Sequence, residues 1–375
     1  MRWFLPAVFM VCAVISWPDA TAMAAEQNLH VGVDVGEVYD SNVFVAPVNR
    51  EEDYITELRP WLLWKRPFGD ASMFTVNCKL TGKLYAKNSD SNTVDQDLGA
   101  KLDFRGARFY IKLEDRFQYS SYPISSTVAQ KVDNWVNDFN AGVGADYYRV
   151  GWEVGLTSTV RQYIRLGSYD YTEIAPYVEG NYKVGEATRV YLRATFGMVN
   201  YLDPVHNDTD YIDVKLGIRG NIGEKTSFDA GIGYQQRNYD DGGSLIDSED
   251  YASISASCTL SYAFSSKTGF SLTLKYGPQE SVNSNYNKVL FAGVSANHFF
   301  TEKISAIGTI TYEDAQNSAS AANDYHKITC AVAAKYEVTS WMALTLELSY
   351  ESRGAATPTT EYERFTAGVF AVLRY

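Results

Sequence analysis

The sequence predicts an all-β fold, a transmembrane antiparallel up-and-down β-barrel of about eighteen strands. The last segment, 365–375, alternates strictly and places Phe365, Val369, Leu373 and Tyr375 on one face. Similar alternating segments recur along the chain, and the breaks between them are alternately short and long, the longer ones being polar. A period of two sets one side of a strand against lipid and the other against water. A strand at the chain terminus can close such a sheet, and closure is needed because lipid offers no partner to an open edge.

The start of the chain predicts a secretory signal peptide. Arg2 precedes an apolar stretch, 3–17, and a small-residue cleavage site follows at 22–24. The apolar stretch is too short for a transmembrane helix. We therefore expect residues 1–24 to be removed and residues 25–375 to form one barrel domain.

The strand count follows from the breaks. The clearest alternating segments are 74–84, 150–160, 190–198, 212–222, 254–264, 270–276 and 342–350. The short breaks are 67–70, 106–107, 148–149, 185–187, 223–225, 265–267, 301–303 and 339–340. The longer ones are 40–53, 88–94, 120–133, 164–169, 202–208, 240–248, 281–285, 316–323 and 354–360. Eight short turns and nine long loops imply eighteen strands, with short turns and both termini on the periplasmic side.

Two regularities favour a barrel over a soluble sandwich, which also has alternating strands. The apolar residues before the last five turns, Val184, Ile222, Phe264, Phe300 and Val338, are 38, 42, 36 and 38 residues apart. The predicted strands exceed the usual soluble length of about 5–6 residues. Aromatic side chains also gather at strand ends, as the two interfacial girdles of a membrane barrel require.

Charge is distributed unevenly between the predicted loops and the predicted strands. The net charge of −12 argues against a nucleic-acid partner. Much of the negative charge lies in loops, for example at 51–53 and 240–241, where we expect it to meet lipopolysaccharide headgroups and their divalent ions. The mean hydropathy of −0.24 is typical of a barrel in which half of every strand faces water.

On each predicted strand, the face opposite the apolar one should line the interior. These faces carry more cations than acids, which predicts a basic interior. The cations predicted inside are Arg59, Lys79, Lys83, Lys101, Arg105, Lys112, Arg116, Arg161, Arg193, Lys215, Arg219, Lys275, Lys335, Arg364 and Arg374. Fewer acids are predicted there, such as Asp103, Glu114, Glu153 and Glu347. A positive wall would concentrate anions; the alternative is a mixed lining that only holds water. The predicted solute-contacting residues are Lys79, Lys112, Arg116, Arg193, Arg219 and Lys275.

Eighteen strands enclose an aqueous channel unless something fills it. The residues between Ala25 and the first strand are too few for a folded plug, but the long loop 120–133 could fold inward and narrow the pore.

The sequence gives little support for catalysis, and no cofactor or metal site is expected. It has no nucleotide-binding, haem-attachment or CxxC motif. Cys78, Cys258 and Cys330 fall on apolar strand faces, where cysteine acts as a small hydrophobe. A barrel lipid hydrolase would use His298 or His326 as its base. A sleeve for a multihaem cytochrome is a further alternative.

One segment resembles a known family. Residues 31–44, which end in the run Tyr-Asp-Ser-Asn-Val-Phe, followed by 53–55 and Pro60, are similar to the opening of the Putative beta-barrel porin 2 family. The turn at 263–268 also resembles turns of that family, so the resemblance spans the mature chain. It implies a barrel in the outer membrane of a Gram-negative bacterium, often encoded beside exopolysaccharide genes. Within the run, Asp40 and Asn42 are also good local turn formers, which needs no ligand.

The sequence and this resemblance together predict a passive outer-membrane channel for the passage or export of an extracellular polysaccharide, with an anionic polysaccharide as the sharper hypothesis. The alternative is a general diffusion porin that prefers anions. The expected partners are lipid and lipopolysaccharide, the barrel-assembly machinery, for which Tyr375 would be the assembly signal, and periplasmic polysaccharide-export proteins.

Overall fold

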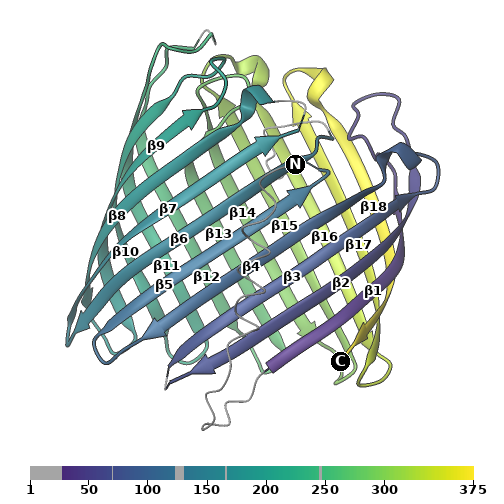
Figure 1. Cartoon of the computed structure of the whole chain (residues 1–375), viewed down its shortest axis with the longest axis horizontal. Coiled ribbons are helices and arrows are strands. Elements are labelled where there is room, and N and C mark those ends of the chain that lie inside the picture. The colour runs from purple at the N-terminus through teal and green to yellow at the C-terminus, as the bar shows by residue number, and fades with distance from the viewer. Residues whose placement is uncertain (1–27, 70, 123–130, 165–166, 245–246) are drawn as a thin grey trace, which may run out of the picture.

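The computed structural model describes residues 28–69, 71–122, 131–164, 167–244 and 247–375; the predicted signal peptide lies outside them. These residues form one closed antiparallel barrel of eighteen strands, each paired with its neighbours in sequence, as predicted (Figure 1). The strands are β1 Asn28–Asp40, β2 Asp53–Phe68, β3 Ser72–Tyr85, β4 Thr93–Arg105, β5 Phe109–Ser120, β6 Asn134–Tyr147, β7 Val150–Tyr163, β8 Tyr171–Lys183, β9 Thr188–Tyr201, β10 Thr209–Ile222, β11 Thr226–Tyr239, β12 Tyr251–Ala263, β13 Thr268–Glu280, β14 Tyr286–Phe299, β15 Ile304–Asn317, β16 Tyr325–Glu337, β17 Met342–Ala355 and β18 Tyr362–Arg374.

The first and last strands close the barrel. β1 pairs with β18 from Gly32 opposite Arg374 to Asp40 opposite Thr366. The Tyr375 N–H donates to the Val31 carbonyl at 2.9 Å, which extends the ladder to the last residue. Pairing between the chain termini leaves no open edge on either strand, as a lipid-facing wall requires.

The alternating side chains separate an apolar outside from a polar inside. Val369, Leu346 and Ile310 point outward, and 59%, 44% and 59% of their surfaces are exposed. The register also places Cys78, Cys258 and Cys330 on the outward face, in agreement with the sequence prediction. The hydrophobic surface is therefore a belt around the barrel rather than a central core.

The long loops lie at the end of the barrel opposite the termini, the extracellular end. Four of them contain one short 3-10 helix each: η1 Ser89–Ser91, η2 Gly167–Tyr169, η3 Ala321–Asn323 and η4 Pro358–Thr360. Within the described ranges, no helix has the length and apolar character needed to cross a membrane.

One strand pair separates towards its extracellular end. β12 and β13 pair only from Ala263 opposite Gly269 to Ala256 opposite Tyr276. β13 stays paired with β14 up to Glu280 opposite Tyr286. The ladder between β12 and β13 ends just before Gly277 and Pro278, and proline has no N–H to donate to it. The end of the β13–β14 hairpin, residues 277–289, is therefore separated from β12, and we call it the inner hairpin.

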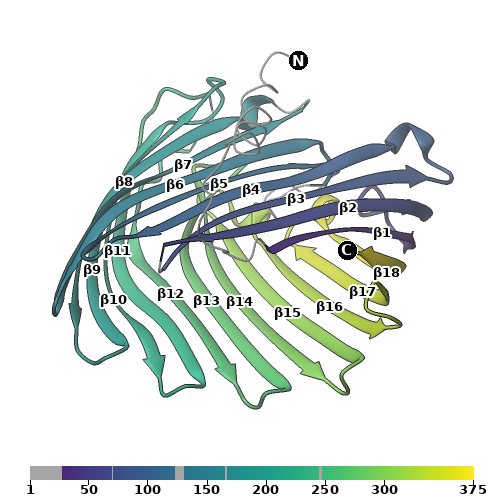
Figure 2. The same ribbon diagram turned by 60° about the horizontal axis from the view of Figure 1, so that its bottom comes forward.

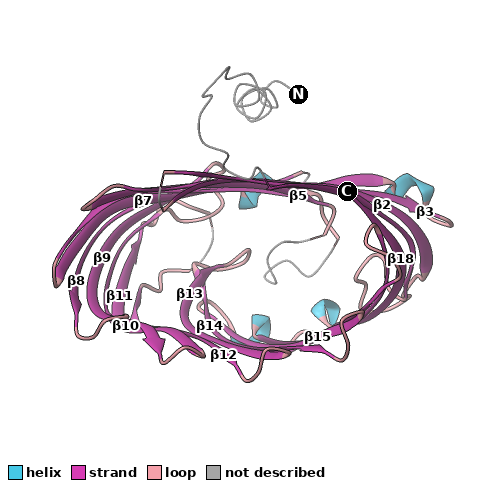
Figure 3. Ribbon diagram, turned by 90° about the horizontal axis from the view of Figure 1, so that it is seen from below, coloured by secondary structure: helices cyan, strands magenta, loops and turns pink. Residues whose placement is uncertain are grey.

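The figures show where the inner hairpin goes. Figure 2 shows β12, β13 and β14 side by side in the wall towards their periplasmic ends. Figure 3, seen from below, shows a barrel that is wider than it is deep, with the ribbons of β13 and β14 turning into its interior.

Candidate functional site: the lumen and its constriction

The inner hairpin lies on the inner side of the wall. In a regular wall, Glu280 and Tyr286 would point outward, as Leu272 and Val294 do on the same faces of β13 and β14. Instead, the Glu280 carboxylate pairs with the guanidinium of Arg237 and accepts a hydrogen bond from the Tyr201 hydroxyl at 3.0 Å. Arg237 and Tyr201 belong to lumen-facing positions of β11 and β9. We call Arg237, Glu280 and Tyr201 the hairpin anchor.

The tip of the inner hairpin reaches β7 and the loop that follows it. Val282 packs on a small apolar cluster formed by Val132, Tyr163 and Tyr169. The Val282 carbonyl is 3.1 Å from Nε2 of His206, in the loop between β9 and β10. Because the hairpin leaves the wall at β13 and contacts residues of β7 and β9, it narrows the lumen near the extracellular end.

A buried polar network fixes the hairpin loop. The Asp247 carboxylate accepts hydrogen bonds from the Asn285 N–H at 2.7 Å and from the Ser318 hydroxyl at 2.6 Å. Asn207 donates to the Asn285 side-chain carbonyl at 2.9 Å. Asn207, Asn285 and Asp247 are all buried. The network joins four loops, and such satisfied buried networks hold a unique arrangement.

A second buried cluster stabilises the closure of the barrel. The guanidinium of Arg364 on β18 donates to both carboxylate oxygens of Asp40 on β1, the shortest bond being 2.6 Å, and stacks 4.1 Å from the centre of the Tyr122 ring. The Asn42 N–H donates to Asp40 at 3.0 Å, which is the predicted turn, and the Asn42 side chain donates to the Glu363 carbonyl at 3.0 Å. We call Asp40, Asn42, Arg364 and Tyr122 the closure cluster.

All six residues predicted to contact the solute point towards the lumen, but four of them are paired with acids. Lys112 binds Glu153 at 2.7 Å, and Arg116 binds Asp97 at 2.7 Å. Arg193 and Arg219 share Glu179, at 2.9 and 2.6 Å. Lys79 and Lys275 are exposed and have no ion pair within the described residues. Whether any of the six contacts a solute stays a prediction.

The expectation of a basic interior with few acids is wrong. Many more carboxylates face inward than the four named from the sequence, and most of the inward cations lie beside one. The additional inward acids include Asp34, Glu57, Asp95, Asp97, Asp138, Asp146, Glu173, Glu179, Asp213, Asp229, Glu313, Glu337 and Glu351. The inner wall is therefore mixed in sign, which is the alternative that the sequence left open.

A different surface lines β12 to β15. There the inward positions of the periplasmic half carry small hydroxyl side chains, and these lie opposite one another across the strands: Thr259, Ser261, Ser271, Thr273, Ser295, Thr309 and Thr311. We call these seven residues the hydroxyl wall. It offers hydrogen bonds without charge.

The remaining predicted residues lie away from the constriction. His298 and His326 are on outward faces of β14 and β16, and Nδ1 of His298 lies 2.8 Å from the Thr268 hydroxyl. Tyr375 is 98% exposed at the end of β18. Most of loop 120–133, residues 123–130, lies outside the described residues; its described end, Lys131 and Val132, lies against Tyr85 and Tyr163 respectively.

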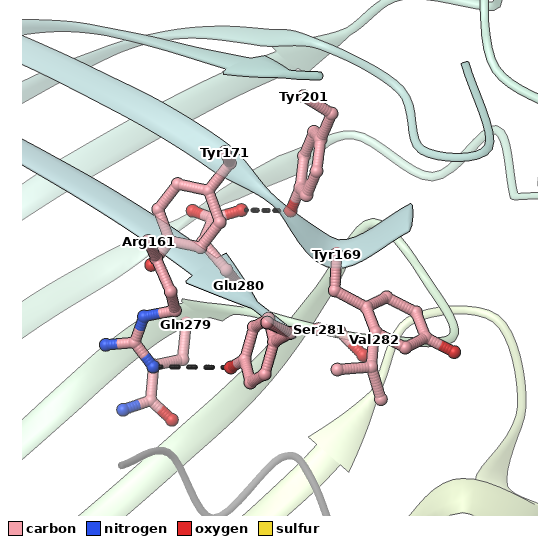
Figure 4. Close-up of a pocket in the computed structure, with 9 residues that line it drawn as sticks. Arg161, Tyr169, Tyr171, Tyr201, Gln279, Glu280, Ser281 and Val282 are labelled. Carbon is pink, nitrogen blue, oxygen red and sulfur yellow. Dashed lines mark hydrogen bonds between the residues drawn. The ribbon is translucent and has the colours of Figure 1, made fainter. Parts of the chain in front are cut away.

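A small cavity of about 70 Å³ lies between the inner hairpin and the opposite wall (Figure 4). Arg161, Tyr163, Tyr171 and Tyr201 line it from β7, β8 and β9, and residues 279–282 line it from the hairpin. The sequence placed Arg161 inside but did not single it out. It also missed the inner hairpin, for which the pair Gly277-Pro278 inside a strand was the available signal.

The comparisons agree with this architecture. The model of the family described as Putative beta-barrel porin 2 matches residues 29–375. The chain is therefore a porin-like channel in the outer membrane of a Gram-negative bacterium. No curated protein matches it.

Solved structures similar to the chain include OpdK from Pseudomonas aeruginosa, with 11% identity, 93% of this chain and 99% of that chain covered, and a TM-score of 0.48. A BenF-like porin from Pseudomonas fluorescens Pf-5 has 10% identity, the same coverage and a TM-score of 0.49. OccAB3 from Acinetobacter baumannii has 8% identity, 93% and 100% coverage, and a TM-score of 0.48.

Proposed function

The chain belongs to the Putative beta-barrel porin 2 family, and from this premise we propose that it is a diffusion porin for small polar solutes, with the inner hairpin as its size filter. The observation that carries the proposal is the position of this hairpin, between the β12–β13 separation and the residues of β7 and β9. An inward segment of this kind reduces the pore cross-section without closing the barrel, and pore width is one determinant of which solutes pass.

The mixed lining supports passage of polar solutes in general. Inward cations are largely matched by carboxylates, so the wall as a whole has no strong preference for one sign of charge. The hydroxyl wall adds uncharged hydrogen-bonding groups along the periplasmic half. These features suit a pore that stays filled with water.

Polysaccharide export, the first expectation from the sequence, is not favoured by these observations. The family match is to a porin, and the inner hairpin narrows the lumen. An enzyme is also disfavoured, because His298 and His326 face outward and neither bonds to a serine among the described residues.

Liposome swelling tests the proposal. Vesicles containing the purified protein should swell in monosaccharides and progressively more slowly in longer oligosaccharides. A variant in which residues 281–285 are replaced by Asn-Gly keeps a two-residue hairpin turn but lacks the tip, and it should admit larger oligosaccharides. Vesicles that exclude even monosaccharides would overturn the proposal, as would loss of polysaccharide secretion, with normal solute uptake, in a deletion strain.

A further inference from the structure

We propose that the cavity between the inner hairpin and β7–β9 is a binding subsite for the carboxylate group of a small solute, with the Arg161 guanidinium as its cation. This inference rests on the proposed porin function and names a class of solute for the constriction.

The Arg161 guanidinium has N–H donors at this cavity that are not fully used in hydrogen bonds. Its Nε is buried and has no hydrogen-bond partner among the described residues. Its Nη1 is 3.5 Å from the Tyr163 hydroxyl, which is a long contact. Its guanidinium carbon lies 5.9 Å from the centre of the Tyr171 ring. No carboxylate among the described residues forms an ion pair with it, and Asp138 acts on its charge only at longer range.

Most of the other lumen-facing arginines are matched by a carboxylate; Arg105, at the periplasmic end of β4, is an exception among the described residues. Eight of them form an ion pair with a carboxylate: Arg59, Arg116, Arg189, Arg193, Arg219, Arg237, Arg364 and Arg374. Arg219 and Arg237 also have an unbonded Nε, but their other nitrogens bind Glu179 and Glu280. An unmatched guanidinium in a narrow part of the pore is costly to desolvate, and a solute anion would offset that cost.

The surroundings fit a carboxylate in particular. A guanidinium presents parallel N–H groups that match the two oxygens of a carboxylate, whereas a lysine would act as a point charge. Glu280 also lines the cavity, but its charge is balanced by Arg237 and its oxygen is bound by Tyr201. The cavity of about 70 Å³ exceeds the roughly 10–15 Å³ that one water needs by the same measure. It therefore admits the carboxylate head while the rest of the solute stays in the lumen.

Bilayer recordings of the full mature protein in sodium propionate test the Arg161 subsite. Propionamide, which has no charge but a similar size, is the control solute in liposome swelling. We expect Arg161→Gln to lower the propionate-to-sodium permeability ratio by about tenfold, which corresponds to about 1.4 kcal/mol. Arg161→Lys should recover only part of the loss. Propionamide swelling should not change in either variant.

Arg105→Gln is the matched control, because Arg105 also faces the lumen without an ion pair among the described residues but lies at the periplasmic end of β4. Retained heat-dependent gel mobility would show that each variant is a folded barrel. Equal losses for Arg161→Gln and Arg105→Gln, or no loss for Arg161→Gln, would overturn the subsite while leaving the porin in place. A wild-type protein that conducts nothing would instead overturn the proposed function.

Discussion

Two buried clusters in the barrel contain the same three residue types, but they have opposite effects on the position of a strand. At the closure cluster, an arginine, a buried carboxylate and a tyrosine join β18 to β1 and complete the wall. At the hairpin anchor, the same three residue types hold part of β13 away from the wall, on the inner side of β9–β11. Arg237 also stacks on Tyr211, 4.6 Å from the ring centre, as Arg364 stacks on Tyr122. A buried Arg–carboxylate–Tyr cluster therefore fixes the position of a strand without dictating where it lies.

The strand ladder explains the difference. At the closure, backbone pairing continues up to Asp40 and Thr366, so the cluster reinforces hydrogen bonds that already exist. At β12–β13 the ladder has ended at Ala256 and Tyr276. The β14 arm of the inner hairpin stays paired with β15 up to Asn287 opposite Asn317, but no strand ladder holds the β13 arm on its β12 side, where side-chain bonds such as the Glu280–Arg237 ion pair hold it instead. We therefore expect mutations in the closure cluster to change mainly the stability of the barrel, and mutations in the hairpin anchor to change mainly its conductance.

The largest effect is expected at the hairpin anchor. Glu280→Gln leaves the Arg237 charge buried without its carboxylate, and breaking such a pair costs about 3–5 kcal/mol. The hairpin should leave its inner position, and single-channel conductance should rise. Arg237→Gln combined with Glu280→Gln removes both charges and should restore most of the wild-type conductance; a wild-type conductance for Glu280→Gln alone would mean that the anchor does not hold the hairpin.

The next largest effect is expected at the closure cluster. Arg364→Gln removes the cation from Asp40, which is 1% exposed, but the Asn42 N–H and Tyr122 hydroxyl remain as donors. We expect a loss of about 3 kcal/mol in the free energy of unfolding, measured by urea titration in lipid vesicles, with little change in conductance. Arg116→Gln is the control, because its ion pair is exposed and worth at most about 1 kcal/mol. Equal losses for the two variants would contradict the account.

A smaller effect concerns pH at the extracellular mouth. Lys131, in the loop before β6, donates to the Tyr85 hydroxyl at 3.2 Å and lies over the Tyr85 and Tyr122 rings. Burial, together with the nearby Lys83 charge, lowers the pKa of Lys131 to about 8. The mouth should therefore lose a positive charge, and the anion-to-cation permeability ratio should fall, as the pH rises from 7 to about 9. Lys131→Met should abolish this step; a step that persists would assign it to another group.

Lys131 also predicts the direction in which the stability of the barrel changes with pH. Because folding lowers its pKa, the folded state disfavours the charged form, and the free energy of unfolding should rise as the pH increases through the folded value of about 8. In Lys131→Met that rise should be absent from urea titrations across the same range.

The smallest effect is expected for Lys79→Gln and Lys275→Gln. Both lysines are exposed and unpaired within the described residues, so solvent and salt screen them. Each change should lower anion preference slightly at low salt and not at high salt, as reversal potentials would show. A change at high salt comparable to that of Arg161→Gln would mean that they, too, bind the solute directly.

Most of the fold could be predicted because it depends on local alternation and turn residues. The short break at 339–340, for example, lies between β16 and β17, and the face of Leu344, Leu346 and Leu348 is outward as expected. Asp40 and Asn42 form the expected turn, but the bond from Arg364 joins residues 324 positions apart and has no local signal.

The constriction could not be predicted for a related reason. Residues such as Glu280 and Tyr286 occupy the same alternating faces as the wall residues before and after them, so the pattern cannot show that a strand has moved inside. The excess of predicted cations had a similar origin: Arg219 was recognised on its own strand, whereas Glu179 becomes its partner only through the register across β8, β9 and β10.

Cross-linking tests the position of the inner hairpin most directly. In a background with Cys78, Cys258 and Cys330 replaced by alanine, Val282→Cys and Val132→Cys place two thiols in one apolar cluster at the constriction. A short bifunctional thiol reagent should join them in the native membrane, whereas Val282→Cys with Ser227→Cys, at the periplasmic end of β11, should stay unlinked. A correctly folded barrel in which Val282 and Val132 cannot be joined would contradict the account.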